Sequence, residues 1–174
     1  MASEKRQTPG PGRREASLPP EGDSIRFDRA VLDDIARAAS AAYPYEGCGA
    51  LLGDSDHVRV MLPLPNIEKG SPRVKFEVSS RDYLRAEREA DAQGLRLVGF
   101  WHSHPDHPAR PSPTDLSRAW EGLLTVIVSV MEGKARDIGA WEIHGRELPF
   151  ELVEIESPGF SGDLVTALSR EGDT

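Results

Sequence analysis

Residues 101–115 read WHSHPDHPARPSPTD and join an apolar strand to the start of a predicted helix. His102 and His104 are two positions apart, so in a β-strand both imidazoles point to the same face and can reach one cation. Val98 and Phe100 share the parity of the histidines, which predicts a site at a strand end beside packed core. A His-x-His pair by itself fits a structural or surface role equally well, so the metal interpretation needs a further ligand.

A carboxylate follows in the same stretch. Asp115 falls in the first turn of a helix predicted over 113–120 and could complete a set of three ligands with the two histidines. Catalytic zinc sites keep three protein ligands and one open position, whereas closed structural sites take four ligands, often cysteines. The alternative is that Ser112, Pro113 and Asp115 are only the N-cap, N1 and N3 residues of a helix. The candidate metal ligands are His102, His104 and Asp115.

The whole pattern resembles the JAMM motif. Its parts, in chain order, are Glu46, His102-Ser103-His104, Ser112 after residues 105–111, and Asp115 after two more residues. A match at these positions with this spacing is far more specific than a histidine pair. The motif belongs to the JAMM/MPN+ (Mov34/MPN/PAD-1) metallopeptidase family, which includes deubiquitinating subunits and compact prokaryotic peptidases. The resemblance extends over about residues 24–155.

The resemblance implies a fold as well as an activity. The fold would be α/β, of the α+β type, with a curved mixed β-sheet flanked by helices as in the cytidine-deaminase-like MPN fold. The predicted elements agree with it, because strands outnumber helices and occur partly as hairpins. Helices are predicted from Asp28 to before Pro44, over 81–93 and over 113–120. Strands are predicted over 24–27, 48–52, 58–64, 76–79, 95–102, 123–131, 138–144 and 148–155.

The chemistry of such a site assigns two further roles. Zinc, one ion per chain, provides a nucleophile at neutral pH by lowering the pKa of a bound water to about 7. The departing amine needs a proton, so a nearby carboxylate must accept one and return it, and Glu46 is the candidate. Taken alone, Glu46 would be a solvated loop glutamate. Ser112 would stabilise the oxyanion of the tetrahedral intermediate, a role compatible with capping the helix.

Two other interpretations use the same histidines. The segment 102–107 also satisfies the His-x-His-x-Asp-His pattern of metallo-β-lactamase-like hydrolases, with Asp106 and His107 as further ligands. That fold needs more histidine downstream and leaves Glu46 and Asp115 without roles. The other interpretation is a non-catalytic MPN scaffold, whose members lack the ligands that are present here.

The substrate is less defined than the reaction. The short segment between His104 and Asp115 leaves little room for the insertions with which deubiquitinases recognise ubiquitin chains. The chain therefore resembles the compact bacterial peptidases that process the C-terminus of ubiquitin-like sulfur-carrier proteins. The partner would be such a protein or its peptide tail, held as an added strand at a sheet edge. A general small-peptide hydrolase is the alternative.

Composition excludes several other classes. The chain has 174 residues and a net charge of −8, which argues against binding to nucleic-acid phosphates. Its one cysteine, Cys48, allows neither an internal disulfide nor a multi-thiolate zinc site and is expected to pack in a strand. The sequence shows no signal-peptide core and no apolar run of membrane-spanning length, so a cytoplasmic location is expected. We expect one domain over 23–156, a disordered leader at 1–22 and a flexible tail at 157–174.

Overall fold

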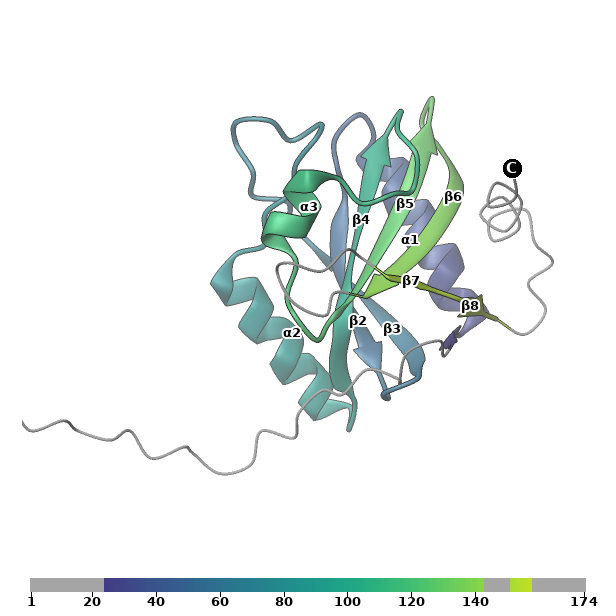
Figure 1. Ribbon diagram of the computed structural model, residues 1–174. Helices are drawn as coiled ribbons and strands as arrows, with labels where there is room; N and C mark the ends of the chain where they lie inside the picture. The colour runs from purple at the N-terminus through teal and green to yellow at the C-terminus, as the bar shows by residue number, and fades with distance from the viewer. Residues whose placement is uncertain (1–23, 143–150, 158–174) are drawn as a thin grey trace, which may run out of the picture.

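The computed structural model describes residues 24–142 and 151–157, which form one sheet with three helices (Figure 1). The strands are β1 (Ile25–Phe27), β2 (Cys48–Gly53), β3 (His57–Leu64), β4 (Arg96–Pro105), β5 (Leu124–Met131), β6 (Lys134–Glu142), β7 (Glu151–Val153) and β8 (Ile155–Glu156). The helices are α1 (Arg29–Ala42), α2 (Ser80–Ala92) and α3 (Pro113–Arg118).

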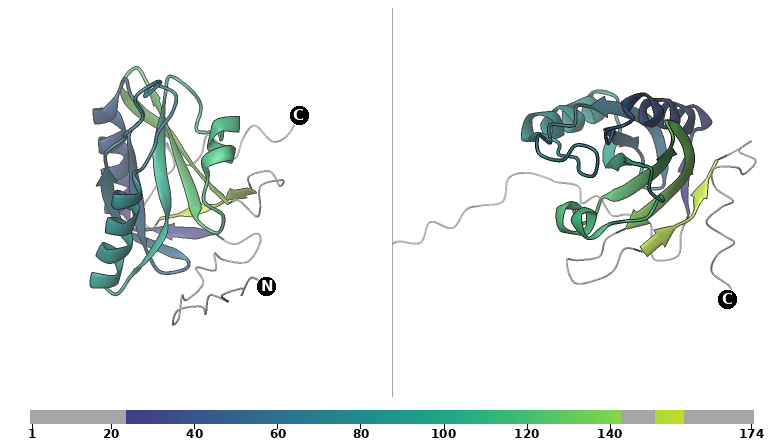
Figure 2. Two further views of the ribbon diagram at one scale, coloured as in Figure 1. Left: turned by 90° about the vertical axis from the view of Figure 1, so that its left-hand side faces the viewer. Right: turned by 90° about the horizontal axis from the view of Figure 1, so that it is seen from above.

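The sheet is mixed, with the strand order β7-β6-β5-β4-β2-β3-β1-β8. β2 pairs antiparallel with both β3 and β4, whereas β4 and β5 run parallel. The parallel pair needs a crossover connection, and α3 lies in it. The view from above shows how strongly the sheet curves (Figure 2). The structure therefore confirms the predicted curved mixed sheet flanked by helices.

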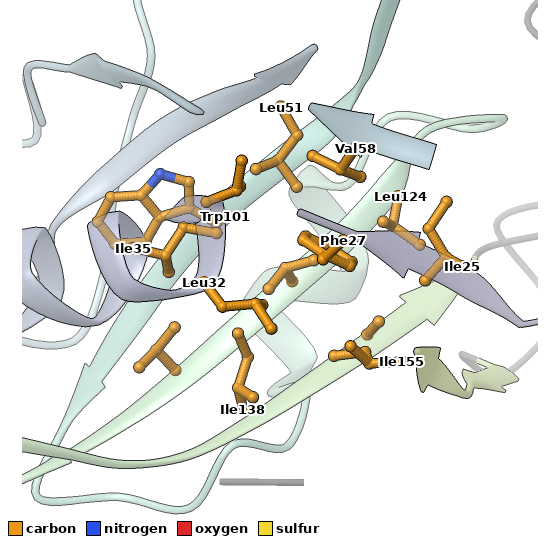
Figure 3. Packing of buried hydrophobic residues seen from close by; sticks show 14 of the residues in the cluster. Ile25, Phe27, Leu32, Ile35, Leu51, Val58, Trp101, Leu124, Ile138 and Ile155 are labelled. Carbon is orange, nitrogen blue, oxygen red and sulfur yellow. The ribbon is translucent and has the colours of Figure 1, made fainter. Parts of the chain in front are cut away.

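α1 covers one face of the sheet, because its apolar residues recur on one side of the helix. Leu32 and Ile35 of α1 pack there with Phe27 and with Trp101 of β4 (Figure 3). Gly49 of β2 allows this packing, since a Cβ atom at that position would lie 2.3 Å from the indole Nε1 of Trp101. α1 begins directly after Asp28 as predicted, but the Asp28 side chain makes no capping hydrogen bond.

α2 and α3 lie on the opposite face, where a second core forms. Side chains alternate between the faces along β2, and Leu51 belongs to the α1 core whereas Ala50 and Leu52 belong to the α2 core. Ala86 and Ala90 bury the inner side of α2 against this face. In Figure 1, α1 lies behind the sheet and α3 in front of it.

A β-bulge between β2 and β4 decides which side chains of β4 share a face. Leu51 pairs with Gly99 and Leu52 pairs with Leu97, so Val98 is the extra residue. Val98 consequently lies in the α1 core, whereas Phe100 lies in the α2 core. The expectation that both share the face of the histidines holds for Phe100 and is wrong for Val98, because the bulge interrupts the alternation.

The segment 65–79 connects β3 to α2 without a strand, so the strand predicted over 76–79 is wrong. Its backbone groups are paired by side chains and turns instead, as described below. The predicted leader, most of the predicted tail, and the predicted strand residues 143–144 and 148–150 lie outside the described residues. Within the described ranges, no helix is long and apolar enough to cross a membrane.

Candidate metal centre

Both histidines of the motif lie near the carboxyl end of β4. His102 pairs with Cys48 of β2 on one side and Ile127 of β5 on the other, whereas His104 lies beyond the first residue of β2. The Nε2 atoms of His102 and His104 are 3.1 Å apart. Both residues are buried. The Nδ1 atom of His104 lies 3.0 Å from the carbonyl oxygen of Pro108, a contact that orients the ring and leaves Nε2 free to bind a ligand.

The first turn of α3 brings Asp115 to the histidines. Asp115 Oδ1 lies 3.0 Å from His102 Nε2, and Asp115 Oδ2 lies 3.3 Å from His104 Nε2. Ser112 holds this carboxylate through a capping box, with both its amide and its hydroxyl 2.6 Å from Asp115 Oδ2. The helix start was the alternative to a metal site. In the structure its capping box orients the Asp115 carboxylate toward the histidines, so the two interpretations are compatible.

The electrostatics of the cluster favour the forms in which these side chains bind metals. Burial lowers the pKa of His102, which keeps its imidazole neutral. Burial alone would raise the pKa of Asp115, but hydrogen bonds from both histidines outweigh burial and hold it well below its usual range. Burial also works to lower the pKa of His104, yet the hydrogen bond and charge of Asp115 together raise it. A proton on His104 would have to leave before a metal binds.

Glu46 is buried beside this cluster, one residue before the Gly47–Cys48 link into β2. Desolvation raises its pKa to about 8, while the charge of His104 lowers it and that of Asp115 raises it. Its Oε2 atom is buried and has no hydrogen-bond partner among the residues that the structure describes. A buried carboxylate oxygen without a partner calls for an explanation, and a site that binds water or a substrate proton provides one.

The donor set fits a metal ion. One ligand atom from each of His102, His104 and Asp115 lies within 4.8 Å of the others, and this is the one such group among the residues described. Two imidazoles and a carboxylate are the donors of open catalytic zinc sites. The structure thus brings together all five predicted site residues: the three ligand candidates, Ser112 on the Asp115 carboxylate, and Glu46 beside the cluster.

Asp106 and His107 stay outside this group. Asp106 accepts hydrogen bonds from the Tyr43 hydroxyl at 2.9 Å and from the amide of Glu132 at 3.0 Å, so both of its carboxylate oxygens already have partners outside the candidate metal group. The metal arrangement of the β-lactamase-like interpretation is therefore not formed. Burial raises the pKa of the Cys48 thiol to about 12, which agrees with a packing role and not a nucleophilic one.

Two neighbours of the site were not predicted from the sequence. The Phe76 ring stacks on His102, with centroids 4.4 Å apart and an interplanar angle of 20°. Arg118 at the end of α3 donates to the carbonyl of Phe76 at 2.9 Å and pairs with Glu68 at 3.3 Å. The segment 65–79 is thereby fixed as a wall of the site. The sequence shows the apolar alternation of residues 76–79. It does not show that Phe76 contacts His102, one of the candidate metal ligands.

Comparison with known proteins agrees with this geometry. The family model described as prokaryotic homologs of the JAB domain matches residues 28–144. This chain belongs to that family. A desampylase of Haloferax volcanii is 35% identical over 102 residues, which cover 57% of this chain and 73% of the relative. A probable TtuB-protein conjugate cleaving protease of Thermus thermophilus is 34% identical over 91 residues, which cover 52% of this chain and 60% of the relative.

The fold agrees with solved structures as well. The solution structure of a protein from Desulfitobacterium hafniense has a TM-score of 0.67 and 29% identity, and the match covers 76% of this chain and 92% of that one. The resemblance to the JAMM/MPN family is thus confirmed, and the predicted fold with it. The chain is a hydrolase of the metallopeptidase type.

Proposed function

We propose that this protein is a zinc-dependent isopeptidase or peptidase that cleaves at the C-terminus of a ubiquitin-like protein. The observation that carries the proposal is the convergence of His102, His104 and Asp115 beside the buried Glu46, whose Oε2 atom has no hydrogen-bond partner in the described part of the chain. A metal site and a base in one buried place supply the activated water and the proton transfer that metal-assisted hydrolysis of an amide uses.

His102 Nε2, His104 Nε2 and the Asp115 carboxylate would hold the ion. Zinc bound by them supplies a water activated at neutral pH and positive charge for the developing oxyanion. The protein contributes the orientation of the ligands, because Ser112 holds Asp115 and the Pro108 carbonyl holds His104.

Glu46 moves the proton. Its unpartnered Oε2 accepts a proton from the attacking water and returns that proton to the departing amine, so the leaving group departs neutral. Burial favours this exchange, since a carboxylate whose pKa is raised toward neutrality both accepts and releases a proton readily.

Ser112 can donate its hydroxyl proton to the oxyanion and still hold Asp115 through its backbone amide. Its hydroxyl has one proton, which points to Asp115 Oδ2 in this structure. The Ser112 amide makes a second bond to the same oxygen at 2.6 Å, so Asp115 keeps one of its two bonds to Ser112 when the hydroxyl turns to the oxyanion.

The names of the relatives support the substrate class. One relative is named a desampylase and another a probable TtuB-protein conjugate cleaving protease, so the second is named for cleaving protein conjugates. We propose a ubiquitin-like sulfur-carrier protein as the substrate here. Its slender Gly-Gly tail would reach ligands that are themselves nearly inaccessible to solvent.

The test uses the zinc-loaded full chain and two substrates read by intact mass. One is a ubiquitin-like carrier joined by its Gly-Gly terminus to the ε-amine of a lysine peptide, and the other carries a short C-terminal extension. We expect release of the intact carrier from at least one substrate, and no release after chelation or with Asp115→Asn. A matched substrate ending in Val-Val should be cleaved far more slowly. Failure on both Gly-Gly substrates would overturn the proposed substrate class.

A further inference from the structure

We infer that Asn66 is a positioning residue that holds Glu46 in place for proton transfer. The inference rests on the proposed function, because it concerns the base of that reaction. It is carried by a set of hydrogen bonds that joins the Asn66 side chain to the backbone of Glu46 and to the wall segment 65–79.

The amide of Asn66 uses its full hydrogen-bonding capacity. Its Nδ2 donates to the carbonyl oxygens of Glu46 at 3.0 Å and Lys75 at 3.1 Å. Its Oδ1 accepts from the amides of Glu68 and Glu77, both at 3.0 Å. These partners also fix the orientation of the side chain, since the first two are carbonyls that can only accept and the last two are amides that can only donate.

Glu46 is tied to the same segment at both of its backbone groups. Its amide donates to the carbonyl of Pro72 at 2.8 Å, and its carbonyl accepts from Asn66. The next residue, Gly47, is fixed from the opposite side, because its amide donates to the Ser103 hydroxyl at 2.8 Å and its carbonyl accepts from the Ser103 amide at 3.0 Å. Asn66 and Ser103 therefore hold the backbone of Glu46 and Gly47 from opposite sides.

These backbone bonds matter because, among the described residues, no hydrogen bond orients Oε2 of Glu46. Because that oxygen has no partner there, the position of the Glu46 backbone determines where the carboxylate lies. Glu46 also precedes β2, whose ladder begins only at Cys48. A side chain from a neighbouring segment thus replaces the missing ladder bond at the position where the base must be fixed.

The alternative is that Asn66 only stabilises the conformation of the segment 65–79, through its hydrogen bonds to Lys75, Glu68 and Glu77. Loss of such a structural residue would affect the fold, the binding of metal or the binding of substrate. The effect would be the same whether or not residue 46 can take a proton. A positioning residue acts through Glu46 and loses its effect when that carboxylate is removed. A double-mutant cycle separates the two.

The experiment compares wild type, Asn66→Ala, Glu46→Gln and the double variant, all zinc-loaded, in steady-state and single-turnover cleavage of the Gly-Gly isopeptide conjugate. We expect Asn66→Ala to lower kcat about 10-fold or more, with KM and zinc content near wild type. In the Glu46→Gln background the same change should lower the rate less than about 2-fold. Ser79→Ala is the matched control, since it removes a side-chain hydrogen bond to Asp82 at the other end of the segment.

The control should change the rate by the same factor in both backgrounds. If Asn66→Ala does not fold, Asn66→Asp replaces it, because that variant keeps the acceptor for Glu68 and Glu77 and loses the hydrogen bonds donated to Glu46 and Lys75. An equal loss from the Asn66 change in both backgrounds, or a rise in KM alone, would overturn the inference. If the wild type cleaves only the C-terminally extended carrier, the same comparison is made on that substrate, and a wild type that cleaves neither substrate would overturn the proposed function. A Glu46→Gln variant of undiminished rate would overturn the role of the base.

Discussion

Ser112 contacts the same oxygen of Asp115 twice, with its amide and its hydroxyl each 2.6 Å from Oδ2. That oxygen also faces His104 Nε2 at 3.3 Å. Ser112 thus orients Asp115, a candidate metal ligand, in addition to the role proposed for it toward the oxyanion.

Ser112→Ala should therefore weaken zinc binding as well as slow the reaction. We expect about a 10-fold loss of zinc affinity, in the range for removed hydrogen bonds to metal ligands, and about 1 kcal/mol of lost stability from the missing helix cap. Competition with a chelator and thermal unfolding measure the two. Ser112→Thr keeps the hydroxyl and is the control. Unchanged zinc affinity in Ser112→Ala would limit the residue to an oxyanion role.

Asp115→Asn should abolish tight zinc binding, because it removes the one charged ligand while preserving size. The wild type is expected to hold about one zinc ion per chain, measured by elemental analysis after dialysis. Asp106→Asn is the matched control and should keep the metal, since Asp106 bonds Tyr43 and Glu132 instead. Two tightly bound ions that depend on Asp106 would favour the β-lactamase-like arrangement.

The ligand set could be predicted from the sequence because each element of it is local. Strand alternation places His102 and His104 together, and helix-start residues place Ser112 on Asp115. The wall of the site could not, because Phe76 reaches His102 and Asn66 reaches Glu46 only through the path of the segment 65–79. The face on which Val98 lies could not be predicted from strand alternation either. The bulge that reverses the alternation depends on how β4 pairs with β2.

In the metal-free protein, Glu46 should make stability fall as pH rises. Its pKa is raised from 4.5 to about 8 by burial, so the folded state keeps a proton that the unfolded state releases. The contribution is present below about pH 4.5 and is lost progressively up to about pH 8, at most about 1.4 kcal/mol per pH unit. Glu46→Gln lacks this dependence, so its stability relative to wild type should increase over that window in urea unfolding with chelator. A constant difference would show that Glu46 ionises freely.

Residues 24–157 should be sufficient for folding, zinc binding and cleavage. They contain the strands, the helices and the five site residues, and the family match begins at residue 28 and ends at residue 144. The predicted domain over 23–156 implies the same. A chain of residues 24–157 should unfold cooperatively and match the full chain in kcat within about 2-fold. A folded, zinc-loaded short chain with a much higher KM would instead assign substrate binding to a terminal segment.

In the proposed mechanism, Glu46 transfers the proton at a site where a metal ion held by His102, His104 and Asp115 would activate water. The most direct measurement is the cleavage rate of Glu46→Gln against wild type, at equal zinc content, on the Gly-Gly isopeptide conjugate. We expect unchanged zinc content, an undiminished melting temperature and a rate lower by at least about 100-fold. A zinc-loaded Glu46→Gln variant that cleaves at close to the wild-type rate would contradict it.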